Sequence, residues 1–235
     1  GMFRKNMILI CHPTNITTVE KNAIRDCAYR AGAKKVYLEE EPKVAAVGAG
    51  LDIGKACGSM VLDIGGGTSD IAVLALGDIV CSTSLKVAGN RFTQLIIDYL
   101  RKERKLAIGE QMAEEVKIRI GSALPMDEPL TMEVSGLAME SGLPSSIEVN
   151  SNEIELALRA SVDEIVRAVR TVMEITPPEL AADIVQRGLM MTGGGALLKN
   201  FDARLRNELQ VPVHVAENAL HCVVDGCSIM LQQLR

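Results

Sequence analysis

The chain has 235 residues, of which 48% are hydrophobic and 23% are charged. A chain of this length and composition can bury a substantial core and differs from disordered segments. Its formal charge is −5, and no stretch interleaves Lys and Arg with aromatic residues, which argues against nucleic acid as a partner. Apolar runs fall short of the roughly 20 residues that a membrane-spanning helix needs, so we expect a soluble, cytoplasmic protein.

The first part of the chain alternates strands and helices. Apolar runs predict buried strands at 7–11 and 36–38. Thr17 and Glu20 have the spacing of a capping box, which predicts a helix that ends at the Ala-Gly pair before the second strand. A short helix with Pro42 in its first turn follows. This order predicts a parallel α/β layer.

The middle of the chain predicts a strand meander and then a small helical subdomain. The meander has a glycine-rich first turn, and the helical part carries a half-exposed hairpin. The predicted strands of the meander are 60–64, 71–76 and 79–87, the two amphipathic helices lie within 89–121, and the hairpin strands are 131–134 and 146–149.

The last third predicts helices around one buried strand. A long helix begins at Ser151 and ends before Pro177-Pro178. The remaining predicted elements are a helix at 179–186, a strand at 188–191, a helix that continues from the following glycines through Leu205, and a final helix from about Leu220 to Leu234.

The first glycine run has the composition of a phosphate-binding loop. Backbone amides of Gly65, Gly66 and Gly67 can approach an anion because no Cβ blocks them. Asp63 beside them can hold Mg²⁺ through water, and Thr68 adds a hydroxyl. A plain hairpin turn is the alternative.

A second glycine run makes an anion site the stronger interpretation. Gly193, Gly194, Gly195 and Ala196 lie between a predicted buried strand and a predicted helix, whose dipole and free N–H groups would favour a phosphate. Neither run matches the Walker or the Rossmann pattern, so both of those sites are disfavoured.

The two runs carry a family resemblance. L-D-I-G-G-G-T-S-D followed by M-T-G-G-G-A-L-L resembles the actin and heat-shock-chaperone ATPase superfamily. Within it, P-T-N-I-T-T-V-E-K, L-E-E-E-P-K-V-A-A-V-G-A-G, T-P-P-E-L-A-A-D-I and A-E-N-A-L-H-C-V resemble the bacterial actins MreB and Mbl. The resemblance covers nearly the whole chain. It implies an α/β, actin-like ATPase (ribonuclease H-like) fold of two lobes that binds ATP or ADP with Mg²⁺, in filaments that guide rod shape and cell-wall synthesis.

The resemblance also implies roles for individual residues. Asp63 would lie near Mg²⁺, and Glu41 and Thr68 would orient the attacking water. Glu41 has an alternative as an exposed acid that complements its helix dipole. The 65–67 glycines would contact the phosphates, and the 193–196 run would contact the nucleoside and the α-phosphate. Glu114 and Lys117 resemble the contacts to base and ribose, with a solvated ion pair as the alternative.

The same resemblance places the family's first phosphate loop before residue 1. The first lobe is therefore expected to be incomplete, with weak nucleotide binding and little turnover, and whether the chain is an enzyme stays open. An unpaired sheet edge would favour self-association.

Val224 to Ser228 departs from the family's G-T-G, which puts domain closure in doubt. The implied subdomains are IA at 1–55 and 224–235, IIA at 56–91 and 153–223, and IIB at 92–152.

The implied partners are other copies of the chain and full-length MreB-type paralogues. Met2 and Phe3 match the position of a membrane-inserting loop, with a frayed terminus or core plug as the alternative. One other function stays open, a truncated, non-catalytic paralogue that caps filaments. A sugar or carboxylate kinase of the superfamily is disfavoured, because we find neither an acceptor-activating carboxylate nor a larger substrate lobe.

The cysteines and histidines suggest no site of their own. The cysteines lack C-x-x-C pairs and metal-ligand spacing, so we interpret them as reduced, mostly buried thiols. The three histidines show no metal-like grouping. These residues are Cys11, Cys27, Cys57, Cys81, Cys222 and Cys227, and His12, His214 and His221.

Overall fold

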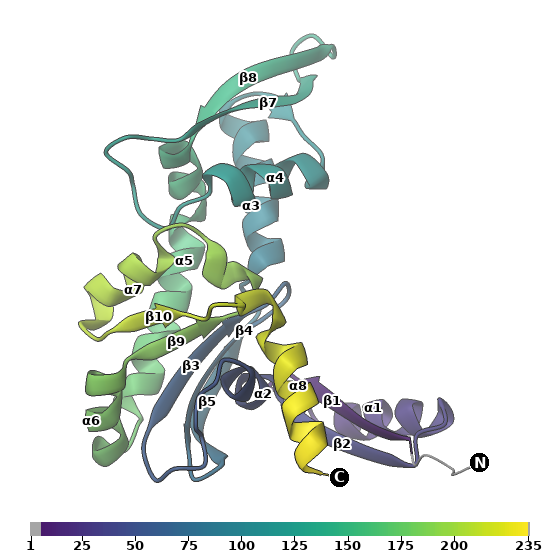
Figure 1. The fold of residues 1–235 in the computed structure, drawn as a ribbon. Helices are drawn as coiled ribbons and strands as arrows, with labels where there is room; N and C mark the ends of the chain where they lie inside the picture. Colours follow the sequence, from purple (N-terminus) through teal and green to yellow (C-terminus); the bar gives the residue numbers. More distant parts are fainter. Residues whose placement is uncertain (1–5, 235) are drawn as a thin grey trace.

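The computed structural model describes residues 6–234, so Met2 and Phe3 lie outside the described residues. Three sheets follow one another in space, as Figure 1 shows: a pair of strands at one side, a five-stranded sheet in the centre, and a three-stranded sheet at the far end. The proposed subdomain boundaries remain a prediction. No helix within 6–234 is long and apolar enough to cross a membrane.

The first layer is the predicted parallel α/β unit. It contains β1 (Met7–His12), α1 (Thr18–Arg30), β2 (Lys35–Glu40) and α2 (Glu41–Gly48), with β1 and β2 parallel. The capping box is confirmed, because the backbone N–H of Glu20 donates to Thr17 Oγ1 at 3.2 Å and the N–H of Thr17 donates to the Glu20 carboxylate at 2.7 Å. Among the described residues, the two strands pair only with each other.

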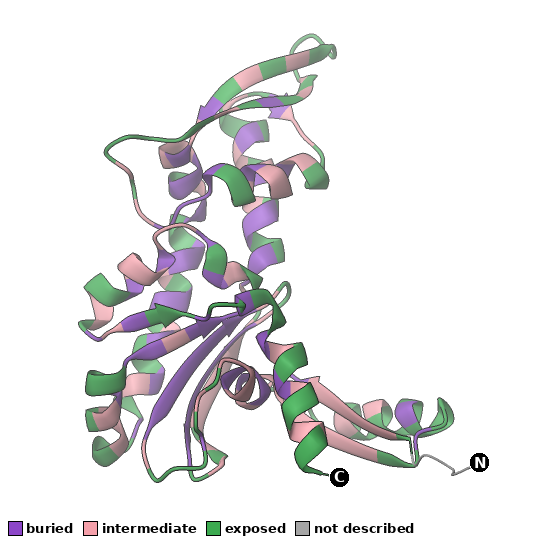
Figure 2. Ribbon diagram, viewed as in Figure 1, coloured by how far each residue is buried: buried purple, intermediate pink, exposed green. Residues whose placement is uncertain are grey.

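The central sheet holds the core of the molecule. Its strand order is β10-β9-β3-β4-β5, with β3, β4 and β5 antiparallel and with β9 and β10 added in parallel beside β3. These strands are β3 (Ser59–Ile64), β4 (Ser69–Ala75), β5 (Asp78–Leu85), β9 (Leu189–Thr192) and β10 (Val213–Val215). Figure 2 shows that β3 and β4 are buried along their whole length, which explains their apolar runs at 60–62 and 71–75.

Helices cover both faces of this sheet. On one face lie α5 (Ser151–Glu174) and α6 (Pro178–Arg187), and on the other lies α2. Helix α5 extends from the sheet toward the far end of the molecule (Figure 1) and buries an apolar stripe at intervals of three and four residues. The stripe is Ile154, Leu158, Val162, Ile165, Val169 and Val172.

The far end of the molecule is a small helical and β subdomain (Figure 1). Helices α3 (Gly89–Glu103) and α4 (Glu110–Ile120) pack against each other and against α5. The predicted hairpin is confirmed as β7 (Thr131–Ala138) and β8 (Pro144–Asn150), and β6 (Leu106–Ala107) adds a short third strand that the sequence reading missed.

The last helix returns the chain to the first layer. Helix α8 (Cys222–Gln233) crosses α2 and contacts β1. The crossing is close, because a Cβ built on Gly226 would overlap the backbone carbonyl oxygen of Val44. The segment that departs from the family's G-T-G therefore still provides a glycine where two helices meet.

Three sequence-based predictions are wrong in detail. The helix predicted to run through Leu205 is interrupted: η1 (Gly194–Leu197) is a single 3₁₀ turn, Asn200 adopts a left-handed backbone with φ of 60°, and α7 (Phe201–Leu209) begins after it. The final helix begins at Cys222, after the 3₁₀ turn η2 (Ala219–His221). The cysteines are free thiols, but only Cys222 is buried and Cys27 is exposed, since little covers the outer face of α1.

Candidate functional site

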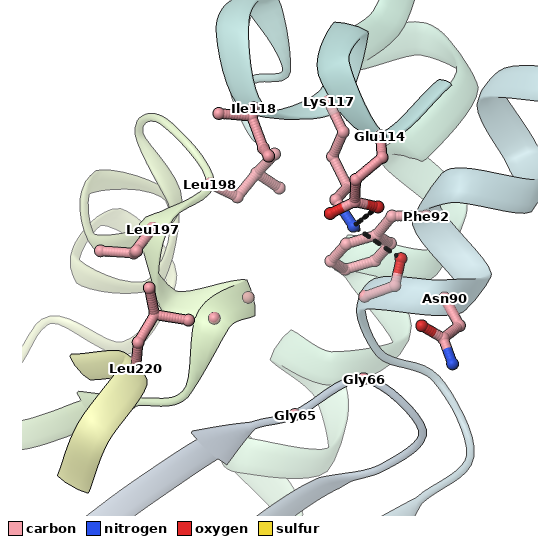
Figure 3. A pocket seen from close by; sticks show the side chains of 13 residues that line it. Gly65, Gly66, Asn90, Phe92, Glu114, Lys117, Ile118, Leu197, Leu198 and Leu220 are labelled. Carbon is pink, nitrogen blue, oxygen red and sulfur yellow. Dashed lines mark hydrogen bonds and ion pairs between the residues drawn. The ribbon is translucent and has the colours of Figure 1, made fainter. Parts of the chain in front are cut away.

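A cavity of about 400 Å³ lies between the two glycine loops and the helices above them (Figure 3). Its size is within the range of small-molecule sites. Apolar side chains form much of its wall, and backbone and charged groups lie at its ends. The cavity is lined by Gly65, Gly66, Gly89, Asn90, Phe92, Glu114, Lys117, Ile118, Gly194, Gly195, Leu197, Leu198 and Leu220.

The first glycine loop connects β3 to β4 and is held by the start of α3. Gly65 N–H donates to Thr68 O at 2.9 Å, and the N–H groups of Gly89 and Asn90 donate to the carbonyls of Gly65 and Gly66 at 3.1 and 2.8 Å. Within residues 6–234, Gly66 and Gly67 donate their own amides to no protein group. The loop therefore offers N–H groups for an anion while its carbonyls are satisfied.

The second glycine loop lies directly on the end of β3. Gly193 has φ of 79°, and a Cβ on it would overlap the carbonyl oxygen of Ile64 and lie 2.9 Å from Asp63 Oδ1. Only glycine permits this approach. The loop leads into a 3₁₀ turn of four residues, not into an α-helix. The predicted helix dipole is therefore absent from this site, and its backbone groups alone could contact a ligand.

Glu114 and Lys117 form one polar end of the cavity. Lys117 Nζ donates to Glu114 Oε2 at 2.7 Å, to Thr93 Oγ1 at 3.0 Å and to the carbonyl of Gly89 at 3.1 Å. The Lys117 side chain is only 15% exposed, so the pair is an anchored network and not a freely solvated ion pair. Partial burial opposes ionisation of Glu114, but the hydrogen bonds from Lys117 and Thr93 outweigh it and lower its pKa.

Three carboxyl groups converge on the other side of the first glycine loop. Asp63 is 5% exposed and accepts a hydrogen bond of 2.8 Å from Thr192 Oγ1. Its antiparallel partner in β4 is Asp70, so both side chains leave the same face of the sheet. Glu41, the first residue of α2, lies close enough to both of them for their charges to raise its pKa.

The convergence changes the acidity of this group of carboxyls. Burial, with smaller contributions from Asp70 and Asp63, raises the pKa of Glu41 to about 7. Burial also raises the pKa of Asp63 to about 6, partly offset by the Thr192 hydrogen bond and increased by Asp70. Glu41 is therefore not the exposed acid of the alternative interpretation, and both groups titrate near neutral pH.

The predicted residues fall into two neighbouring groups. Around the cavity lie Gly65, Gly66, Glu114, Lys117, Gly194 and Gly195. Asp63 and Glu41 belong to the acidic cluster, and Gly193 lies between the two groups, beside the end of β3 that carries Asp63. Gly67 and Thr68 lie at the tip of the β3–β4 turn, outside the cavity lining. Ala196 is buried in the core, so its side chain packs and does not reach the cavity.

Sequence reasoning missed Asp70 and the apolar wall. Asp70 ends the same glycine turn that Asp63 begins, and the hairpin register of that turn could have predicted that the two face each other. Phe92, Leu198 and Leu220 come from three separate segments, so no local pattern identifies them as one surface.

An α/β framework with a cavity between two glycine loops is typical of an actin-like fold. Comparison with solved structures agrees: the crystal structure of MreB5 of Spiroplasma citri bound to ADP has a TM-score of 0.94 and 40% identity, covering 98% of this chain and 70% of that one. A second MreB5 structure, bound to AMPPNP, has a TM-score of 0.93 and 40% identity, over 98% and 69% of the two chains. The MamK double helical filament has a TM-score of 0.82 at 20% identity, over 97% and 69% of the two chains, and this likeness shows the fold alone.

The chain belongs to the family described as MreB/Mbl protein, which matches residues 1–235. It is 53% identical over 234 residues to the cell shape-determining protein Mbl of Bacillus subtilis, covering 100% of this chain and 70% of that protein. It is 48% identical over 227 residues to the cell shape-determining protein MreB of Escherichia coli, covering 97% of this chain and 65% of that protein.

Proposed function

We propose that this chain binds ADP or ATP in the cavity between the 65–67 and 193–195 loops and acts as a filament subunit in rod-shape determination. The cavity with its two glycine loops is the observation that carries the proposal. The two MreB5 structures support it, since both hold an adenine nucleotide in a chain 40% identical to this one.

The cavity suggests which part of the nucleotide each wall would meet. The free amide of Gly66, which lines the cavity, suits phosphate oxygens, and the free amide of Gly67 lies next to it at the tip of the turn. The apolar wall suits a purine ring, and the Glu114 carboxylate, held by Lys117, offers acceptors to ribose hydroxyls or base edges. The phosphates would then lie toward the acidic cluster, next to Asp63.

The acidic cluster fits a hydrated divalent cation. The buried Oδ2 atom of Asp70 has no hydrogen-bond partner, and Asp63 lies opposite it. Carboxylate oxygens are the ligands that Mg²⁺ prefers. Within residues 6–234, no group of three His, Cys, Asp or Glu side chains is arranged to hold a metal ion directly. A cation here would therefore be held through its waters and the phosphates, and it would supply positive charge against the phosphate oxygens.

Glu41 and Thr68 are the proposed residues for orienting a water molecule. A carboxyl group with a pKa of about 7 can accept or donate a proton near neutral pH, which suits general acid–base chemistry. Thr68 lies in the same turn as Gly66 and Gly67, whose amides are proposed to contact the phosphates. Hydrolysis at this position remains a proposal.

Calorimetry with ADP and ATP in the presence of Mg²⁺ tests nucleotide binding. The chain and its Asp63→Ala variant should be compared, with Asp202→Ala at the half-exposed start of α7 as the matched control. We expect micromolar binding that is lost in Asp63→Ala and retained in Asp202→Ala. Absence of binding by the unmodified chain would contradict nucleotide binding and favour the non-catalytic capping module.

Filament formation needs a separate experiment. Sedimentation of the chain alone, and with a full-length Mbl relative, should give a pellet that increases with added ATP. A chain that stays in the supernatant alone but shortens the relative's filaments would support the capping module. A chain with no effect in either experiment would contradict both roles.

A further inference from the structure

The two carboxylate oxygens of Asp70 have different surroundings. Asp70 is 1% exposed. Its Oδ1 accepts hydrogen bonds from the backbone N–H of Thr14 at 3.1 Å and from Thr14 Oγ1 at 3.2 Å. Its Oδ2 is buried and has no hydrogen-bond partner among the described residues. A buried carboxylate oxygen without a donor is unfavourable, so a donor from outside the protein chain is expected.

The fold shows which side this oxygen faces. Asp70 lies on the same face of β4 as Ala72 and Leu74, and that face packs against Ala46 of α2. Asp63, the partner of Asp70 in β3, leaves the same face. Asp70 therefore points into the space between the central sheet and the start of α2, beside the first glycine loop.

This space concentrates negative charge. Glu41 and Asp63 each feel the charge of Asp70, and no Lys or Arg among the described residues perturbs either group. Three acids without a basic partner are unfavourable when ionised together. A divalent cation with its water shell would offset the charge and supply the missing donor, because metal-bound water is a hydrogen-bond donor.

The other oxygen ties Asp70 to a different part of the chain. Thr14 lies in the loop between β1 and α1, 56 residues before Asp70. The same loop is fastened a second time, where Asn15 Nδ2 donates to the backbone carbonyl of Ser84 in β5 at 3.2 Å. The loop thus connects the first layer to the central sheet through groups on β4 and β5.

We propose that Asp70 is a positioning residue that links the water shell of the nucleotide's divalent cation, through Oδ2, to the β1–α1 loop, through Oδ1. The inference rests on the proposed nucleotide binding, since the cation is the one bound with the phosphates. Binding of the cation would then hold the first layer against the central sheet.

Asp70→Asn tests the roles of the two oxygens separately, because it replaces one oxygen with an NH₂ group and changes the shape of the side chain little. The amide can still accept from Thr14 through its oxygen, but its NH₂ group cannot accept from a metal-bound water. We expect the affinity for ADP in the presence of Mg²⁺ to fall at least about 10-fold, the usual effect of removing a group that supports a metal's ligands. The affinity for ADP in EDTA should not change. Asp202→Asn removes the same charge from half-exposed Asp202 of α7, which pairs with Arg206, and should alter neither affinity.

Hydrogen exchange of the β1–α1 loop provides a second readout that does not depend on affinity. In the unmodified chain, Mg²⁺ with ADP should slow exchange at residues 13–17 more than ADP in EDTA does. Thr14→Val, which keeps the Asp70 charge but removes one donor, should keep the Mg²⁺-dependent affinity and weaken this protection.

The outcomes separate the two proposals. If the unmodified chain shows Mg²⁺-dependent ADP binding and Asp70→Asn matches it, the role of Asp70 is overturned while nucleotide binding stands. Unchanged loop exchange in Thr14→Val would likewise overturn the link to the loop. If the unmodified chain binds no ADP, both proposals fail. Circular dichroism should confirm that each variant is folded, and Thr14→Val keeps the inference testable should Asp70→Asn unfold.

Discussion

Gly226 of α8 lies against the backbone carbonyl of Val44 in α2, at a distance that excludes any side chain. This contact joins the C-terminal helix to α2, which begins with Glu41 and packs against the central sheet. The backbone of a buried helix cannot move aside without disturbing the packing around it.

Replacing Gly226 by Ala should therefore destabilise the fold. We expect the free energy of unfolding to fall by about 1–3 kcal/mol, the usual effect of overpacking. Gly109→Ala is the matched control, because a Cβ there meets no atom within 4 Å. Urea unfolding followed by circular dichroism measures both variants, and equal midpoints would contradict the close crossing.

Lys117 should contribute to nucleotide affinity through the network at the end of the cavity. Lys117→Met removes three hydrogen bonds from the ammonium group and leaves Glu114 without its basic partner. Glu114 would then no longer be held in place to accept from the nucleotide. A hydrogen bond to a charged group contributes about 1.5–3 kcal/mol, so ADP affinity should fall at least about 10-fold.

The control for Lys117 lies on the same helix. Arg119 pairs with Glu115 four residues away and does not line the cavity. Arg119→Met should therefore leave ADP affinity unchanged in calorimetry. If both variants lose affinity equally, the loss comes from the charge of the helix and not from the cavity wall.

The raised pKa values of Glu41 and Asp63 predict a pH dependence of stability. The protonated forms are favoured in the folded state, so these groups stabilise the fold most below about pH 4, where they are protonated in the unfolded chain as well. That contribution is lost as the pH rises through about 6 for Asp63 and about 7 for Glu41. For Asp63 the loss is at most about 3 kcal/mol.

Urea unfolding at pH 4.5 and pH 8 checks this prediction. Asp63→Asn should gain stability relative to the unmodified chain as the pH rises. Glu114→Gln should show no such gain over this range, since the lowered pKa of Glu114 confines the loss of its contribution to lower pH. Parallel pH profiles for Asp63→Asn and the unmodified chain would show that the Asp63 carboxyl is not perturbed.

Local chemistry explains which elements could be predicted. The Thr17–Glu20 capping box, the apolar stripe of α5 and the glycine turn after β3 depend on residues within a few positions of one another. The short strands β6 and β10 lack such a signal, because they exist only where a neighbouring strand offers its free edge. The 3₁₀ turn after Gly193 was also missed, since its backbone is set by the contact with Ile64 on another strand.

By itself, the sequence determined the α/β class, the order of the main elements, the two glycine loops and, through its motifs, the family. Only the tertiary structure decided how the site is assembled. The cavity wall combines α3, α4 and the segments around the 3₁₀ turns, and the acidic cluster brings Glu41, Asp63 and Asp70 together. The hydrogen bond between Thr14 and Asp70 spans 56 residues. Such contacts depend on how β1, α2 and the central sheet are placed in space, and no spacing within one segment encodes that placement.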